Sequence, residues 1–155
     1  MIKGKPSVKC ACGKKSVIDK LVMYSKEEFD TYYELFRNEG NLLFELMSKK
    51  AVINDYNDEL MNVYRCIKNE EEFSLMCKEL NKHETYHSEK YYYEIRKLDR
   101  NKDKYNKMPS YKKASRLIYL NKTCFNGLYR VNSKNEFNVP FGKKTKVNTY
   151  NGGWI

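Results

Sequence analysis

The chain has 155 residues, which is enough to bury the core of one domain, so nothing requires a second. Its 30 lysines and arginines exceed its 20 aspartates and glutamates, and the formal net charge of +10 suggests a polyanionic partner. No apolar run approaches the length of a membrane span and lysines occur throughout residues 1–20, so we expect a soluble, intracellular protein without a secretory leader.

The first part of the chain alternates predicted strands and helices. Val17, Ile18, Leu21 and Val22 recur at helical spacing and predict a short helix over residues 16–23. The elements predicted after it are an aromatic strand over 31–36, a helix over 42–47, an apolar strand over 51–53 and a helix over 60–67. Two successive strand–helix units are typical of a layered α/β fold.

The middle of the chain is predicted to be helical and highly charged. Apolar residues follow helical spacing over residues 70–100 and again over residues 110–120. The positions expected to face inward are Phe73, Leu75, Met76, Leu80, Tyr91, Tyr92, Ile95, Ala114, Leu117, Ile118 and Leu120. Two β-prone runs, residues 128–131 and 136–139, then flank an Asn-rich turn and predict a β-hairpin. Residues 148–155 carry little structural signal.

The positive charge is concentrated in the carboxy-terminal part. Residues 97–155 hold 14 basic and 3 acidic side chains, which leaves 16 basic and 17 acidic side chains for residues 1–96. A basic segment that also carries Tyr, Phe, Asn and Arg is typical of a surface that faces phosphates and reads bases. Composition alone is equally compatible with a solvated, lysine-rich surface.

The cysteines and histidines do not predict a metal centre. Five cysteines, at positions 10, 12, 66, 77 and 124, form no disulfide framework, and Cys10 and Cys12 lack a second pair at zinc-site spacing. They are interpreted as ordinary thiols in a reducing compartment. His83, Glu84 and His87 spell HExxH, the pattern of zinc metalloproteases, but no third ligand is evident. The surrounding lysines and glutamates favour a solvent-exposed polar helix face instead.

Residues 120–142, LNKTCFNGLYRVNSKNEFNVPFG, strongly resemble the target-recognition hairpin of Dam-type DNA adenine methyltransferases. Weaker similarity to the same family extends upstream through AVINDYNDEL (residues 51–60), YYELFRNEGNLLFEL (32–46) and KPSVKCACGKK (5–15). The resemblance implies an α/β fold: a partial Rossmann-like, S-adenosylmethionine-dependent methyltransferase sheet with an inserted helical target-recognition region and a β-hairpin. The implied parts are the amino-terminal α/β region (1–68), the recognition region (69–142) and a basic tail (143–155).

The resemblance also implies a reaction and a cofactor. Dam-type enzymes transfer a methyl group from S-adenosylmethionine to the exocyclic amino group of adenine, typically in GATC, after flipping the base out of the duplex. The implied cofactor-binding positions are Cys10, Lys14, Glu34, Phe36, Gly40 and Asp55, with no metal. Cys10 replaces the family's stacking Trp, and Asn38 and Glu39 replace two of its three glycines. We therefore expect weakened cofactor binding.

The positions implied to contact double-stranded DNA have better-preserved side chains. Arg130 is expected to form a bidentate contact with a guanine edge, and Phe125 and Leu128 are expected to enter the base stack. Lysines near the carboxy terminus are placed for phosphates. The complete set is Lys9, Phe125, Asn126, Leu128, Arg130, Asn132, Pro140, Lys143, Lys144 and Lys146. The alternative is an ordinary exposed β-hairpin.

The family's Asp-Pro-Pro-Tyr motif does not occur in these 155 residues, so we expect no methylation by this chain alone. Four interpretations stay open. The chain is an inactive fragment or remnant of a methyltransferase, or a non-catalytic DNA-binding protein, such as a phage or mobile-element decoy or anti-restriction factor. Alternatively it is one half of a split methyltransferase, or an interaction protein whose truncated sheet is covered by a protein partner.

Overall fold

The computed structural model describes Val8, residues 18–25, residues 30–35, Leu42, Leu46 and residues 49–149. The first elements are helix α1 (Ile18–Met23) and the strands β1 (Tyr32–Leu35) and β2 (Ala51–Asn54). These three confirm the helix and the two strands predicted for this part of the chain. The helix predicted over residues 42–47 lies largely outside the described residues.

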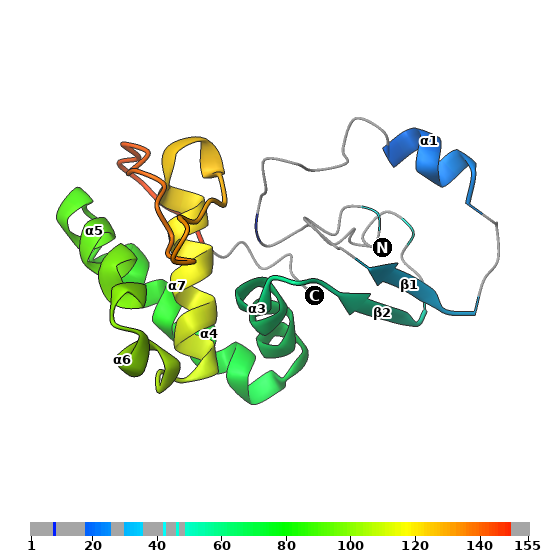
Figure 1. The fold of residues 1–155 in the computed structure, drawn as a ribbon, viewed down its shortest axis with the longest axis horizontal. Helices are drawn as coiled ribbons and strands as arrows, with labels where there is room; N and C mark the ends of the chain where they lie inside the picture. The colour runs from blue at the N-terminus through cyan, green and yellow to red at the C-terminus, as the bar shows by residue number, and fades with distance from the viewer. Residues whose placement is uncertain are drawn as a thin grey trace.

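Strands β1 and β2 form a small parallel sheet. Tyr32 pairs with Ala51 at one end, and Leu35 pairs with Asn54 at the other. Figure 1 shows this sheet and α1 on one side of the larger helical body. Within the described part of the chain the fold is therefore mixed α/β, mostly helical, with two paired strands. This confirms the predicted class at that coarse level.

The helical body contains α3 (Asp58–Lys68), α4 (Glu70–Thr85), α5 (Glu89–Lys97), the 3-10 turn η2 (Leu98–Arg100), α6 (Lys102–Asn106), α7 (Ser110–Thr123) and the 3-10 turn η3 (Phe125–Gly127). Four of the helices begin where a side-chain oxygen accepts a hydrogen bond from the backbone amide three residues ahead. The capping residues are Asn57, Asn69, Ser88 and Asn101. Such caps satisfy amides that have no partner within the first helical turn.

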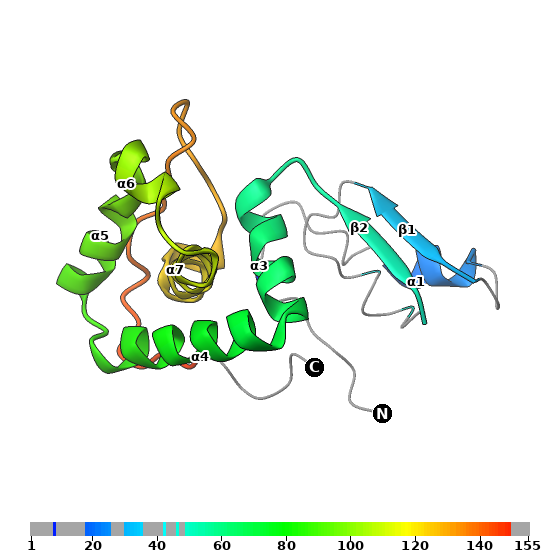
Figure 2. The same cartoon turned by 90° about the horizontal axis from the view of Figure 1, so that it is seen from below.

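Helix α7 lies at the centre of the helical body. Figure 2 shows it nearly end-on, with α3, α4 and α5 around it. Every residue from Ala114 to Asn121 is buried, so α7 is covered on all sides over two turns. The inward positions predicted for it, Ala114, Leu117, Ile118 and Leu120, are all fully buried. No helix among the described residues is long and apolar enough to cross a membrane.

Two apolar clusters pack against α7. The first fills the space between α3, α4 and α7 and contains Val8, Leu60, Val63, Cys66, Met76, Leu80, Ala114, Leu117 and Ile118. The second joins α5 and α7 to the segment after α7 and contains Tyr92, Tyr119, Leu120, Cys124, Phe137 and Val139. The segment that resembles the recognition hairpin is therefore packed onto α5 and α7 through this second apolar cluster.

The predicted β-hairpin is wrong in form. Residues 124–142, here named the post-α7 loop, contain only two isolated antiparallel bridges, Cys124 with Phe141 and Val131 with Phe137. Around the second bridge, the Asn132 amide donates to Glu136 O (3.0 Å) and the Asn138 amide donates to Arg130 O (3.1 Å). The two limbs, residues 128–131 and 136–139, do run antiparallel, but no regular strand forms. The Glu136 amide donates to Asn132 Oδ1, and Asn138 O lies 3.4 Å from Arg130 Nη2, so neither group completes its backbone pair with the opposite limb.

Candidate nucleic-acid interface

A rigid turn at the end of α7 exposes the Phe125 side chain. The buried Cys124 ends the helix, and the Phe125 amide donates to Pro140 O at 2.9 Å. Asn126 (φ 54°) and Gly127 (φ 65°) then turn the chain through the left-handed region, which asparagine and glycine tolerate. Phe125 remains 53% exposed although it follows directly after the core. An aromatic ring is thus presented to solvent from a backbone held at both ends.

Gly142 packs directly against the end of α7, beside this turn. Its amide donates to Thr123 O at 2.9 Å, which brings the returning limb against the last turn of α7. A Cβ atom at position 142 would lie 2.5 Å from the Cys124 carbonyl oxygen and 2.7 Å from the Thr123 carbonyl oxygen. Only glycine permits this approach of two backbone segments.

Replacing Gly142 by alanine is expected to lower the free energy of unfolding by about 1–3 kcal/mol, because the methyl group must displace backbone atoms. Chemical denaturation followed by circular dichroism measures the change. Lys143→Ala is the control, since this neighbouring side chain is exposed and its removal should change stability by no more than about 0.5 kcal/mol. Equal stability of the two variants would show that the post-α7 loop can move away from the end of α7 without lowering the free energy of unfolding.

Arg130 is exposed on the first limb of the post-α7 loop and is oriented by Asn138 on the second. Its Nε donates to Asn138 Oδ1 at 2.8 Å, and its Nη2 lies 3.4 Å from Asn138 O. The Asn138 amide returns a hydrogen bond to Arg130 O. The guanidinium is therefore supported by a neighbour while remaining at the surface.

Asn132 shapes the tip of the same loop. Its Oδ1 accepts hydrogen bonds from the amides of Lys134 and Glu136, both at 3.0 Å, and its Nδ2 donates to Glu136 Oε2 at 2.7 Å. Asn135 adopts φ 56° in the turn. The predicted DNA contact by Asn132 stays a prediction, since its side chain holds the turn together in this structure.

The remaining predicted contact residues surround the turn. Asn126, Pro140, Lys143, Lys144 and Lys146 are exposed, and Leu128 is half-buried against the second core cluster. The Lys144 ammonium donates to Lys122 O at the carboxyl end of α7, where a cation is favoured by the helix dipole. An exposed aromatic ring, an oriented guanidinium and several cations thus lie along one connected segment. This combination suits a surface that contacts phosphates and bases.

Comparison with known proteins places the chain in a family. The family model for D12 class N6 adenine-specific DNA methyltransferases matches residues 12–151. The chain belongs to this methyltransferase family. It is 40% identical over 139 residues to type II methyltransferase M1.LlaDCHI of Lactococcus lactis subsp. cremoris, a match covering 90% of this chain and 48% of the relative.

Other methyltransferases are similar over a comparable extent. Type II methyltransferase M.MjaIII of Methanocaldococcus jannaschii is 37% identical over 153 residues, covering 90% of this chain and 52% of the relative. The DNA adenine methylase of Haemophilus influenzae is 29% identical over 143 residues, covering 91% and 48%. The chain thus spans about half the length of these relatives, and the resemblance of the sequence to adenine methyltransferases is confirmed.

The cofactor positions of this D12 class chain are described only in part. Lys9, Cys10, Lys14, Phe36 and Gly40 lie outside the described residues. Glu34 is buried on β1, and Asp55 follows directly after β2, so both belong to the carboxyl ends of two adjacent parallel strands.

Asp55 Oδ1 accepts a hydrogen bond from the Asn57 amide at 2.9 Å, just before α3 begins. D12 class methyltransferases generally use S-adenosylmethionine. A carboxylate after a parallel strand fits such a ligand, because it can accept hydrogen bonds from ribose hydroxyls.

The HExxH motif holds chain segments together. His83 is only 6% exposed. Its Nδ1 atom is 2.8 Å from Tyr91 Oη, and its ring stacks on Tyr119 with the ring centroids 4.9 Å apart. The predicted solvent-exposed face is therefore wrong for His83, because the motif faces α5 and α7. No group of three potential ligands that could hold a metal ion occurs in the described part of the chain.

The other two residues of the motif, Glu84 and His87, contact the tail from the end of α4 and the residues just after it. His87 Nδ1 lies 2.9 Å from Tyr119 Oη, and its Nε2 lies 2.9 Å from Lys144 O. Glu84 Oε1 accepts hydrogen bonds from the amide and the hydroxyl of Thr149, which is fully buried. Lys144 and Thr149 therefore contact the helical body, although residues 148–155 carry little structural signal in the sequence.

Two of the buried cysteines have thiols that are hard to ionise. Burial raises the pKa of Cys66 to about 12, with the Glu72 carboxylate as a further cause. Burial also raises the pKa of Cys124 to about 11. Cys66, Cys77 and Cys124 are free thiols, whereas Cys10 and Cys12 lie outside the described residues. The predicted interpretation as ordinary thiols agrees with this part of the structure.

Sequence reasoning missed the polar residues behind the post-α7 loop. Arg116 is 1% exposed on α7 and pairs with the buried Asp99 of η2, with Arg116 Nη2 and Asp99 Oδ2 2.7 Å apart. Arg116 lies between two predicted core positions, Ala114 and Leu117. A charged residue flanked by core positions on a buried helix is the signal that could have located this pair.

Proposed function

We propose that this chain is the DNA-reading part of a D12 class methyltransferase and that it binds duplex DNA at GATC through the post-α7 loop. The observation that carries the proposal is the exposed Arg130 guanidinium, oriented by Asn138 on the same loop as the exposed Phe125. A guanidinium held in one orientation is suited to the O6 and N7 acceptors of guanine. An intracellular, DNA-associated location follows from this proposal.

The other residues of the interface take supporting roles in this proposal. Phe125 enters the base stack beside the target, where an exposed ring on a rigid turn can replace a flipped base. Asn126 and Pro140 contact base edges or a thymine methyl group, and Lys143, Lys144 and Lys146 contact phosphates. Leu128 supports the turn and Asn132 supports the loop tip through contacts within the protein. Lys9 is a further DNA contact in this proposal.

Methyl transfer from S-adenosylmethionine to the N6 amino group of adenine is proposed for the whole protein. The described residues proposed to contact the cofactor are Glu34 and Asp55; Cys10, Lys14, Phe36 and Gly40 are proposed by resemblance. The replaced Trp and glycines lower the cofactor affinity of this chain. The 155-residue chain is proposed to bind DNA without methylating it, since it carries no Asp-Pro-Pro-Tyr motif.

Arg130→Ala is expected to lower the ratio of affinities for a GATC duplex and a scrambled duplex by about 10–100-fold, as loss of a bidentate guanine contact costs ~1–3 kcal/mol. Fluorescence anisotropy near physiological salt measures both dissociation constants, with and without S-adenosylmethionine. Lys134→Ala is the matched control, because Lys134 is another exposed cation on the same loop. It should weaken binding to both duplexes equally.

Two outcomes would contradict the proposal. Equal, salt-sensitive binding of the wild-type chain to both duplexes would show that it contacts phosphates without reading bases. Methyl transfer to DNA by the purified 155-residue chain, measured with radiolabelled S-adenosylmethionine, would contradict the proposed lack of catalysis.

A further inference from the structure

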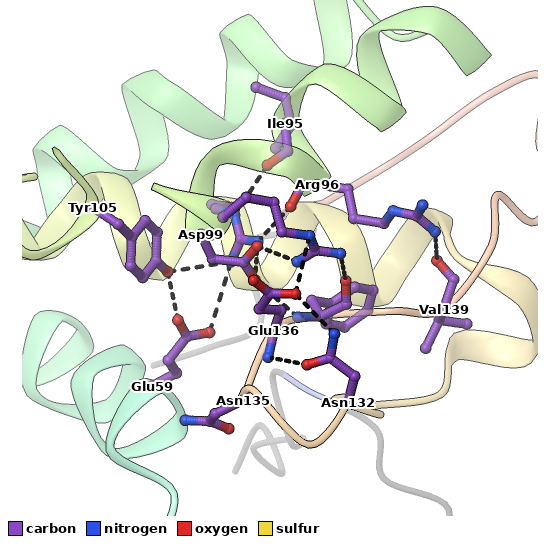
Figure 3. Close-up of polar contacts among 12 residues, drawn as sticks. Glu59, Ile95, Arg96, Asp99, Tyr105, Asn132, Asn135, Glu136 and Val139 are labelled. Atoms are coloured by element: carbon purple, nitrogen blue, oxygen red, sulfur yellow. Dashed lines mark hydrogen bonds and ion pairs between the residues drawn. The ribbon is translucent and has the colours of Figure 1, made fainter. Parts of the chain in front are cut away.

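Four side chains from α5 and η2 hold the second limb of the post-α7 loop on both sides of Asn138. The Phe137 amide donates to Asp99 Oδ2 at 2.8 Å, and Phe137 O accepts from Arg100 Nη2 at 2.7 Å. On the other side, Val139 O accepts from Tyr92 Oη at 2.8 Å and from Arg96 Nη1 at 3.0 Å. Figure 3 shows the contact from Arg96 to Val139 and the Asp99 carboxylate among its partners. We name the four residues Tyr92, Arg96, Asp99 and Arg100 the clamp.

The clamp is itself fixed to α7 by Arg116. This buried guanidinium donates from Nε to Ile95 O (3.0 Å) and from Nη2 to Arg96 O (2.9 Å), and it pairs with Asp99. Its Nη1 donates to Tyr105 Oη at 3.2 Å. Because both backbone carbonyls and the carboxylate are held by one buried side chain, the end of α5 and η2 cannot shift independently of α7.

The held segment leads directly to Arg130. Asn138 lies between the two clamped residues, and its Oδ1 accepts from Arg130 Nε at 2.8 Å while its amide donates to Arg130 O at 3.1 Å. The direction of the Arg130 side chain therefore depends on where Asn138 lies. That place is set by hydrogen bonds from the helices to residues 137 and 139.

We propose that the clamp determines sequence discrimination by positioning Arg130, although none of its side chains needs to touch the base that Arg130 reads. This inference rests on the proposed reading function of Arg130. A base-reading group has to be held within about 0.5 Å and 10–20° of its productive geometry. A free arginine side chain loses considerable rotamer entropy on binding, and a pre-positioned one loses less.

The double variant Tyr92→Phe/Arg96→Met removes both hydrogen bonds to Val139 O while keeping an aromatic ring and an unbranched chain. The adjacent double variant Tyr91→Phe/Lys97→Met is the matched control, since it loses one hydroxyl and one cation from the same helix. The Tyr91 hydroxyl contacts His83 and Lys97 is exposed, so the control leaves the loop contacts intact. Both variants have the same net charge.

The readout is the ratio of affinities for the duplex preferred by the wild-type chain, selected from a random library, and for its scrambled version. We expect the ratio to fall about tenfold in the Tyr92/Arg96 variant and to stay within about twofold of wild type in the control. Affinity for the scrambled duplex should be the same in both. Amide hydrogen exchange in the Tyr92/Arg96 variant should be faster at Asn138 and unchanged at the core amides of α7, whereas a general loss of stability would speed exchange at both. Tyr92→Phe alone, which keeps Arg96, serves if the double variant does not fold, and its ratio should fall about threefold.

The outcomes separate this inference from the proposed function. If Arg130→Ala abolishes discrimination but the Tyr92/Arg96 variant keeps the full ratio despite faster exchange at Asn138, the positioning role is overturned and the reading function stands. If the wild-type chain discriminates no sequence at all, both are overturned.

Discussion

Replacing Asp99 by alanine is expected to lower the free energy of unfolding by about 3–5 kcal/mol. Asp99 is 3% exposed, and its carboxylate pairs with the buried Arg116 and accepts from the Phe137 amide. It also pairs with Arg100. Without it, the buried Arg116 guanidinium keeps, among the described residues, two carbonyl groups, the Tyr105 hydroxyl and the Glu59 carboxylate 3.8 Å away as partners. Urea denaturation at neutral pH, followed by circular dichroism, measures the loss.

Two variants test the explanation. Asp103→Ala removes an exposed carboxylate from the nearby α6 and should change stability by no more than about 0.5 kcal/mol. In Asp99→Leu/Arg116→Met both charges are replaced by apolar side chains, so much of the lost stability should return. If Asp99→Ala cost less than about 1 kcal/mol, the buried guanidinium would have to find other compensation, and Arg116 would not anchor the clamp as described.

Most helices of this chain were predictable because their signals are local, but α6 and the break between α4 and α5 were not predicted. Apolar residues three and four positions apart predicted the buried face of α7, and the caps at Asn57 and Asn69 coincide with the starts of α3 and α4. The two strands were predicted from short apolar and aromatic runs. That α7 is covered on all sides was not predicted, because the burial of Arg116 depends on carbonyl partners 20 and 21 residues earlier in the chain.

The form of the post-α7 loop could not be predicted from strand propensity. Its outward backbone groups at Phe137 and Val139 bond to side chains 37–47 residues earlier in the chain. Its inward groups at Glu136 and Asn138 partly bond to side chains of the opposite limb, and the pairing expected of a hairpin is reduced to one bridge at Val131. Propensity describes how a residue fits a pleated surface and contains no information on such long-range partners.

The candidate site was predicted mainly through resemblance. The residues expected to face DNA are largely exposed, including Phe125, Asn126 and Arg130. The resemblance did not indicate that Asn138 orients Arg130 or that Asn132 is engaged within the loop tip. Those relations depend on side-chain geometry across two limbs, and a pattern of residue types does not specify it.

A pH-dependent loss of stability is expected from His83. Its imidazole is buried between α4, α5 and α7, with Tyr91 and Tyr119 against it and Glu79 and Lys82 as the charged groups nearby. Burial lowers the pKa of His83 from 6.5 to about 4 in the folded chain, and the nearby Glu79 and Lys82 charges act in opposite directions. The folded state therefore prefers the neutral ring, while the unfolded chain takes up a proton below pH 6.5.

The contribution of this histidine is fully present above pH 6.5 and is lost as the pH falls toward 4, because the unfolded state then binds more protons. The loss should reach about 3 kcal/mol at pH 4. The test measures the free energy of unfolding of wild type and of His83→Phe every half pH unit from 7.5 to 4. Comparing the two isolates the contribution of His83 from the titration of carboxylates, which both proteins share. Phenylalanine keeps the stacking on Tyr119 but cannot titrate, so the difference between the two curves should change by that amount. Parallel curves would mean that the folded chain accommodates the protonated His83 imidazole at no cost in stability, which would contradict this prediction.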